Sequence, residues 1–132
     1  MDFSSIVIME RDESSKQLTR ELGSYEIEDG GEYISRAYCE NNVIYIYFST
    51  GRDVEDWEYT ALCEEFDEDL FESSGYEVGF DEDEFNPTWI FKFQFSEDHN
   101  EVEGKICELC IKFKEEIERS LSYIEDKDND YK

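Results

Sequence analysis

The C-terminal part of this 132-residue sequence carries one continuous apolar stripe, which constrains the fold more than any other feature. Its apolar residues recur at spacings of three and four positions, as on one face of an α-helix. A helix with such a stripe must bury it against another layer of secondary structure. Asn100, followed three residues later by Glu103, predicts a capping box where this helix begins. The stripe consists of Val102, Ile106, Leu109, Cys110, Phe113, Ile117, Leu121 and Ile124.

The region before this helix is rich in residues that favour β-strands. Residues 33–39 and 43–49 are joined by Glu40-Asn41-Asn42, and asparagine tolerates the positive φ angles that a tight hairpin turn requires. The second segment is β-branched and aromatic, as central strands are. We therefore predict a hairpin here, and three further strands at residues 6–9, 18–27 and 88–95.

Residues 54–66 fit either a strand or a helix, and we interpret them as a strand. Apolar residues at alternate positions favour the strand. These alternating residues are Trp57, Tyr59, Ala61 and Cys63. The helical alternative depends on a second set that would share one face of a helix, namely Val54, Trp57, Ala61 and Leu62.

A short helix is expected in the middle of the chain. Asp67 is a favourable N-cap residue, Gly75 is a typical C-terminal stop, and residues 68–74 lie between them. The elements together predict an α+β fold, with an antiparallel sheet of about five or six strands packed against the long C-terminal helix. A chain of this length predicts one domain, over residues 1–125, followed by a polar tail at 126–132.

Negative charge is the second dominant feature, and it is concentrated. The formal net charge is −25, and residues 53–86 contain 15 acidic residues and no basic residue. Phosphates would be repelled, so direct binding to nucleic acid or to an anionic membrane is not expected. Aromatic residues make up 16% of the chain, which favours a packed fold over an acidic disordered segment.

We expect a cytoplasmic protein, because signals for export and membrane insertion are missing from the sequence. No basic residue precedes the short apolar segment near the N-terminus, as it would in a signal peptide. No apolar segment approaches the roughly 20 residues of a membrane span. The four cysteines are therefore expected to be reduced thiols, at Cys39, Cys63, Cys107 and Cys110.

Signals for catalysis or metal binding are weak. Cys107 and Cys110 form a C-x-x-C motif inside the predicted helix, where small buried thiols are the simplest interpretation. His99 is the only histidine, and no nucleophile motif accompanies it. Residues 126–130 have acidic side chains at alternate positions, as at the start of an EF-hand loop, but the glycine and the glutamate that such a loop requires are missing. We therefore predict no enzymatic activity, no cofactor and no specific metal site.

The acidic residues between 53 and 86 are the remaining candidate site. Gathered on one surface, their carboxylates would approximate an array of phosphates and attract a basic protein. Four aromatic residues are candidate apolar anchors if exposed and core residues if buried, namely Trp57, Tyr59, Phe66 and Phe71. The candidate partner-binding residues are Glu58, Glu64, Glu65, Asp67, Glu68, Asp69, Glu72, Asp81, Glu82, Asp83 and Glu84.

These features favour a small acidic protein that binds and inhibits a basic, nucleic-acid-handling partner by occupying its phosphate-binding surface. An inhibitor of a host nuclease or defence complex, carried by a phage or mobile element, fits this description. An immunity protein against a nuclease toxin fits it equally well. The alternatives are a solvated acidic face without a partner, a non-catalytic scaffold or housekeeping domain, and a divalent-cation-binding protein.

Overall fold

The computed structural model describes residues 5–27, 29–125 and 127, and it has an α+β fold. Six strands form one sheet in the order β2-β1-β3-β4-β6-β5. Neighbouring strands pair antiparallel except β1 and β3, which are parallel, so the sheet is mixed. The strands are β1 (Ser5–Arg11), β2 (Leu18–Glu26), β3 (Ile34–Glu40), β4 (Val43–Ser49), β5 (Glu77–Phe80) and β6 (Thr88–Gln94). The helices are η1 (Gly31–Tyr33), α1 (Asp56–Glu65), α2 (Asp69–Glu72) and α3 (His99–Ile124).

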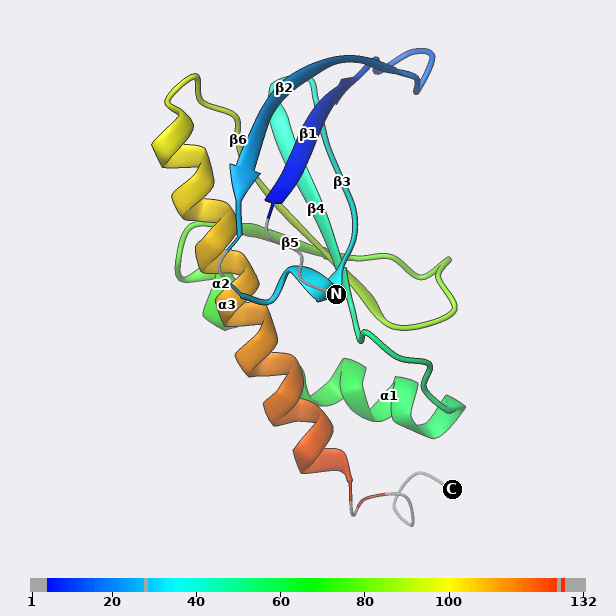
Figure 1. Cartoon of the computed structure of the whole chain (residues 1–132). Coiled ribbons are helices and arrows are strands. Elements are labelled where there is room, and N and C mark those ends of the chain that lie inside the picture. The colour runs from blue at the N-terminus through cyan, green and yellow to red at the C-terminus, as the bar shows by residue number, and fades with distance from the viewer. Residues whose placement is uncertain (1–4, 28, 126, 128–132) are drawn as a thin grey trace.

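The long helix α3 crosses one face of the sheet (Figure 1), which confirms the predicted packing of the C-terminal helix. The apolar stripe faces the sheet, and Ile106, Phe113 and Ile117 have no exposed surface. The Phe113 ring stacks on Phe48 from β4, with ring centroids 4.7 Å apart. Burying each such side chain stabilises the fold by about 1.5–3 kcal/mol. The stripe therefore fixes α3 on the sheet.

Helix α3 begins before the predicted capping box, and that prediction is wrong. Asp98 is the N-cap, and its Oδ1 accepts hydrogen bonds from the backbone N–H groups of Asn100 (3.1 Å) and Glu101 (3.3 Å). Aspartate at this position already satisfies the free donors of the first turn. Glu103 instead accepts a hydrogen bond from the backbone N–H of Glu26 (2.8 Å), which ties α3 to the end of β2.

The predicted hairpin is present as β3 and β4. Glu40 pairs with Val43 across the turn, and Asn41 and Asn42 have φ angles of 52° and 68°. Two consecutive positive φ angles give the turn a twist that matches the flanking strands. Asn41 and Asn42 therefore set the register of the β3–β4 hairpin.

Residues 54–66 contain helix α1, so the predicted strand is wrong. The helix starts with a capping box, in which the side chains of Glu55 and Glu58 satisfy each other's backbone N–H groups. Only Ala61 and Leu62 of this helix are buried. Because so few of its positions face the core, their spacing carried little helical periodicity, and the alternating apolar residues suggested a strand.

Strand β5 supplies the sixth strand and was not predicted. It is four residues long and pairs with β6, with Phe80 opposite Trp89. The short middle helix is confirmed as the single turn α2, but its N-cap is Glu68 and not the predicted Asp67. Asp67 Oδ1 instead accepts a hydrogen bond from the backbone N–H of Asp69 (3.1 Å), just before the turn. Gly75 follows this turn with a φ of 98°, a conformation that favours glycine.

Candidate acidic interface

The eleven candidate carboxylates form two clusters. The loop cluster contains Glu58 near the start of α1 and the acids of the β5–β6 loop, Asp81, Glu82, Asp83 and Glu84. The α2 cluster contains Glu64, Glu65, Asp67, Glu68, Asp69 and Glu72. Figure 1 shows α2 and the β5–β6 loop at opposite ends of β5. Along α1, the uncharged residues 59–63 separate the clusters, and six residues of helix span about 9 Å.

The β5–β6 loop is fastened to the chain that leads into α1. Asn86 Oδ1 accepts a hydrogen bond from the backbone N–H of Val54 (3.1 Å), and its amide nitrogen donates to Asp53 Oδ1 (3.0 Å). Inside the loop, Asp81 Oδ1 accepts from the backbone N–H of Asp83 (3.0 Å). The loop cluster therefore adjoins the acidic residues before α1, and its backbone is held by specific contacts.

Glu58 has a structural role within the loop cluster. Arg52 donates to its Oε2 at 3.0 Å, and the backbone N–H of Glu55 donates to its Oε1 at 2.9 Å. The hydrogen bond from Arg52 lowers the pKa of Glu58 below its ordinary value, although burial opposes this. Glu58 is therefore already paired within the chain, and the exposed charge of this cluster comes from the loop itself.

Phe85 stands out at the end of the acidic run, because 77% of its surface is exposed. It lines a cleft of about 380 Å³ between the β5–β6 loop and the ends of β3 and β4, together with Ser35, Ser49 and Glu84. Sequence reasoning did not identify Phe85. The signal was available, because an aromatic residue between four acids and an Asn-Pro turn has few apolar neighbours in sequence.

The four candidate aromatic anchors lie mostly in the core. Phe66 and Phe71 are buried, and Phe66 stacks on Trp89 with ring centroids 4.2 Å apart. Tyr59 is half-buried and contacts Phe80 edge-on at 6.0 Å. Trp57 is half-buried, and its indole N–H donates to a carboxylate oxygen of Glu55 (2.8 Å). Their burial favours the packing interpretation for Phe66 and Phe71.

The α2 cluster is partly neutralised by Arg119 from α3. The Arg119 guanidinium donates hydrogen bonds to Glu65 Oε1 (2.7 Å) and to Glu116 Oε1 (2.9 Å). Glu116 also accepts a hydrogen bond from the backbone N–H of Asp67 (2.9 Å). These contacts join the α1–α2 connection to α3. Burial, followed by the neighbouring acids Glu72 and Asp69, raises the pKa of Glu68 above its ordinary value.

The cysteines and the histidine take part in structural contacts. Cys107 Sγ donates to the backbone carbonyl of Glu26 (3.2 Å), and burial raises the pKa of Cys110 to about 12. His99 stacks on Tyr25 at 4.8 Å, and its Nε2 lies 3.2 Å from Glu103. Within the described residues, no group of three or more His, Cys, Asp and Glu side chains is arranged to hold a metal ion. The EF-hand-like residues 126–130 lie outside the described residues, apart from Lys127.

Comparison with known proteins identifies the family and leaves the function open. The model of a family of unknown function, DUF6762, matches residues 1–132. The chain belongs to the DUF6762 family. Neither a curated protein nor a solved structure matches this DUF6762 chain. Among its described residues, no helix is long and apolar enough to cross a membrane.

Proposed function

We propose that this protein is a non-catalytic binding protein that engages a basic, nucleic-acid-handling partner through the loop cluster and blocks the partner's phosphate-binding surface. The observation that carries the proposal is the exposed Phe85 directly after four consecutive acids. Interface hot spots favour large aromatic anchors that become desolvated on binding. The surrounding carboxylates would steer a basic surface onto this anchor.

The contacts of the loop support specific binding. Asn86 ties it to Val54 and Asp53 at 3.1 and 3.0 Å, and Asp81 holds the turn from within. A loop that is already ordered loses less conformational entropy when it binds, and this saving appears as affinity. A flexible acidic tail of the same composition would lack that advantage.

The density of negative charge favours a partner that handles nucleic acid. Residues 81–84 are four acids in succession within one turn, so their charges lie close together. Duplex DNA carries one charge per roughly 1.7 Å of axis over both strands. Within the described residues, no ion pair involves Glu82, Asp83 or Glu84, so their charge is available to a partner. A surface that binds phosphates is the basic surface best matched to such an array.

Affinity capture from cell lysate at low and high salt tests the proposal. The loop variant combines Glu82→Gln, Asp83→Asn and Glu84→Gln, and it leaves Asp81 intact because that side chain holds the turn. A second variant, Phe85→Ser, removes the anchor. We expect basic nucleic-acid-binding proteins on the wild-type resin, released by salt and by added duplex DNA. Either variant should weaken their binding by about tenfold or more.

The matched control removes three charges from the α2 cluster through Glu64→Gln, Asp69→Asn and Glu72→Gln. This variant should retain the captured proteins. Recovery of neutral metabolic enzymes alone, or equal loss of binding in the loop variant and the control, would contradict the proposal. A purified captured protein should also lose its nucleic-acid binding when the wild-type chain is added, and retain it when the Phe85→Ser variant is added.

A further inference from the structure

The cleft beside Phe85 has a chemical character that the proposed function does not yet use. It has a volume of about 380 Å³ and lies where η1 and the ends of β3 and β4 meet the β5–β6 loop. Three carboxylates line it, namely Glu32 from η1, Asp53 from the segment before α1, and Glu84 from the loop. Glu32 lies outside the acidic segment 53–86, so the sequence did not connect it with this site.

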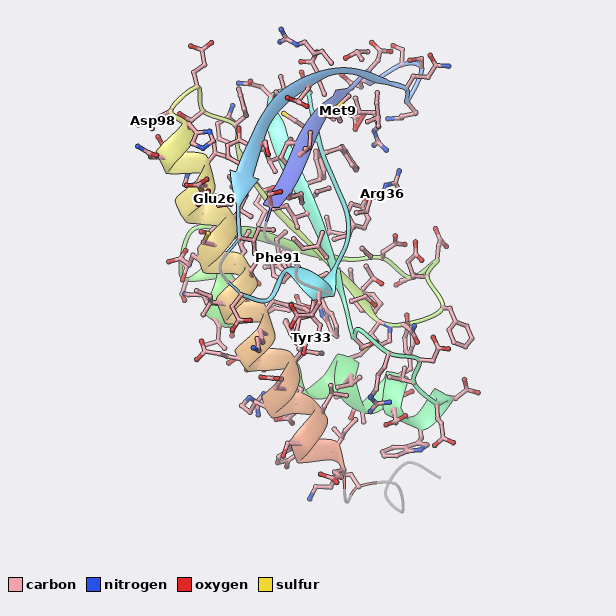
Figure 2. All side chains as sticks on the ribbon, in the orientation of Figure 1. Met9, Glu26, Tyr33, Arg36, Phe91 and Asp98 are labelled. Atoms are coloured by element: carbon pink, nitrogen blue, oxygen red, sulfur yellow. The ribbon has the colours of Figure 1, made fainter. Side chains whose placement is uncertain are left out.

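Two aromatic side chains give this cleft its apolar surface. One is Phe85, which is 77% exposed. The other is Tyr33, which extends from η1 toward α3 (Figure 2), where its ring centroid lies 5.7 Å from that of Phe113. Gly51 packs on the same tyrosine, because a methyl group placed on Gly51 would lie 3.1 Å from the ring. The cleft therefore combines a tyrosine held by its neighbours with a phenylalanine ring that is open to a ligand.

The polar side chains of the cleft are mainly hydrogen-bond acceptors. Ser49 Oγ donates its hydrogen to the Pro87 carbonyl (2.9 Å), and Ser35 Oγ donates to the Tyr47 carbonyl (3.4 Å). A hydroxyl has one hydrogen to donate, so both serines offer a ligand only the lone pairs of their oxygens. The three carboxylates are also acceptors. A ligand that donates several hydrogen bonds is therefore the one that matches these walls.

The negative charge of the cleft is not neutralised from within. Arg52 is the one basic residue among its described lining residues. The Arg52 guanidinium donates to Glu58 Oε2 (3.0 Å) and to the backbone carbonyl of Asp53 (3.0 Å), so its hydrogen bonds are directed elsewhere. No ion pair in the described part of the chain involves Glu32, Asp53 or Glu84. The cleft thus gathers uncompensated carboxylates around an exposed aromatic ring, and a cation is the ligand of complementary charge.

Two observations decide which kind of cation matches the cleft. The carboxylates are too widely spread to share one small ion, because the described residues contain no group of three or more His, Cys, Asp and Glu side chains arranged to hold a metal. The exposed ring of Phe85 offers a flat π surface to a cation. A guanidinium is planar, stacks on such rings and spreads five N–H donors over several acceptors. An ammonium group is compact and strongly hydrated, and so matches less well.

We propose that this cleft receives an arginine side chain of the protein partner, whose guanidinium stacks on Phe85 and donates hydrogen bonds to Glu32 and Glu84. The inference rests on the proposed function, because it names the side chain by which that partner is recognised. Surfaces that bind phosphates favour arginine, since its donors match two phosphate oxygens at once. A partner that handles nucleic acid therefore has such side chains where this chain would block it. Glu32 becomes a partner-binding residue outside the acidic segment.

Titration of the full chain with blocked tripeptides, followed by the backbone amide signals in NMR, tests the inference. The peptides are acetyl-Gly-Arg-Gly-amide and its counterparts with lysine and with citrulline, the neutral isostere of arginine. We expect the arginine peptide to bind with a dissociation constant on the order of 1 mM, because one side chain supplies few contacts. The lysine and citrulline peptides should each bind at least about threefold more weakly. The amide of Gly51 in the cleft should shift on binding, whereas that of Gly104 on α3 should not.

Three variants test the contacts named in the proposal. Phe85→Leu keeps an apolar side chain but removes the π surface, so it should abolish the preference for arginine over lysine. Glu32→Gln and Glu84→Gln should each weaken binding of the arginine peptide by about two- to fivefold. The matched control is Glu77→Gln, which removes the same charge from an exposed residue of β5 that does not line the cleft. This control should bind the arginine peptide as the wild-type chain does.

Competition on the affinity resin separates failure of this inference from failure of the proposed function. At equal concentration and ionic strength, the arginine peptide should release the captured partner more completely than the lysine peptide. Equal release by both peptides, with the partner still lost from the loop variant, would overturn the arginine assignment and leave the proposed function standing.

Two results of the titration would also overturn the inference. One is equal affinity of the wild-type chain for the arginine and lysine peptides, or equal weakening by Glu32→Gln and Glu77→Gln. The other is tighter binding of free L-arginine than of the blocked peptide, which would assign the cleft to a small molecule. Selective binding of the arginine peptide without capture of any basic protein would refute the proposed function and support the preference of the cleft for arginine.

Discussion

Substitution of Glu116 by alanine should be among the most destabilising single changes in this protein. Glu116 lies on α3 and is 4% exposed. Its carboxylate accepts hydrogen bonds from the backbone N–H of Asp67 (2.9 Å), from Arg119 Nε (2.9 Å) and from the hydroxyl of Ser120 (3.3 Å). One side chain therefore joins α3 to the start of the α2 cluster, and its removal leaves three donors without their acceptor.

The expected loss follows from the burial of those donors. A hydrogen bond to a charged acceptor contributes about 1.5–3 kcal/mol when both groups are desolvated. Arg119 is 46% exposed and keeps its contact with Glu65, so its share is discounted for solvent screening. Ser120 has no exposed surface, and Asp67 N–H loses a defined partner. Together these give a loss of about 2–3 kcal/mol, or roughly 8–12 °C in Tm for a chain of this size.

Urea unfolding followed by tryptophan fluorescence measures this loss, since Trp89 is buried in the core. The matched control is Glu118→Ala, an exposed position two residues along the same helix, which should change stability by less than about 0.5 kcal/mol. If Glu116→Ala is no more destabilising than the control, the carboxylate does not hold the α1–α2 connection to α3.

The pH dependence of the difference between wild type and Glu116→Gln provides a second measure. Burial raises the pKa of Glu116, but the hydrogen bonds from Arg119, the Asp67 backbone and Ser120 outweigh it and hold the pKa below its ordinary value of 4.5. A carboxyl whose pKa is lowered by folding stabilises the fold above its unfolded-state pKa, and this contribution is lost as pH falls through the folded-state pKa. The difference should therefore be full at pH 7 and should shrink below about pH 4.5.

Three further predictions concern the backbone, the thiols and the net charge. Gly30→Ala should destabilise the fold by about 2 kcal/mol or more, because Gly30 has a φ of 85° and the added methyl group would clash with the Cys110 carbonyl. Gly75 has a φ of 98° but lies in open space, so Gly75→Ala should destabilise the fold by only about 1 kcal/mol. Thermal unfolding of both variants measures the difference. In the folded chain, a thiol reagent at pH 8 should modify exposed Cys63 first and leave Cys110 unreacted until unfolding, since burial raises the pKa of Cys110 to about 12; early reaction of Cys110 would contradict the core packing. Moderate NaCl should raise Tm, because it screens the self-repulsion of a chain with net charge −25, and a Tm independent of salt would argue against that repulsion.

The fold was predictable where one local pattern sets one element. The stripe around Phe113 specifies α3, and Asn41-Asn42 specifies the hairpin. Prediction failed where tertiary contacts decide. Helix α1 buries only two residues, and its capping box at Glu55 and Glu58 is the local signal that distinguishes it from a strand. Strand β5 is short and exists because β6 pairs with it, which no local pattern in an acidic segment reveals.

The sequence predicted the negative charge of the candidate site but not its separation into two clusters. The sequence indicates a dense acidic segment, but only the fold places its two ends at opposite ends of β5 (Figure 1). The helical form of α1 also changes which acids act together, because it withdraws Glu58 into a cap. The exposure of Phe85 depends on the loop held by Asn86, a contact between residues 32 positions apart.

The placement of basic residues explains how so acidic a segment stays attached to the fold. Arg52 pairs with Glu58 at the start of α1 (3.0 Å), and Arg119 pairs with Glu65 at its end (2.7 Å). Each pair removes negative charge where the acidic segment meets the body of the protein, and so reduces repulsion at the two points that must stay close. No comparable ion pair reaches Glu82, Asp83 or Glu84 within the described residues. Because the chain has 37 acidic residues and 12 basic ones, most of its carboxylates have no cation to pair with, and the lack of an ion pair alone does not distinguish this loop. The exposed ring of Phe85 directly after these acids is the feature that distinguishes the loop from the rest of the acidic surface.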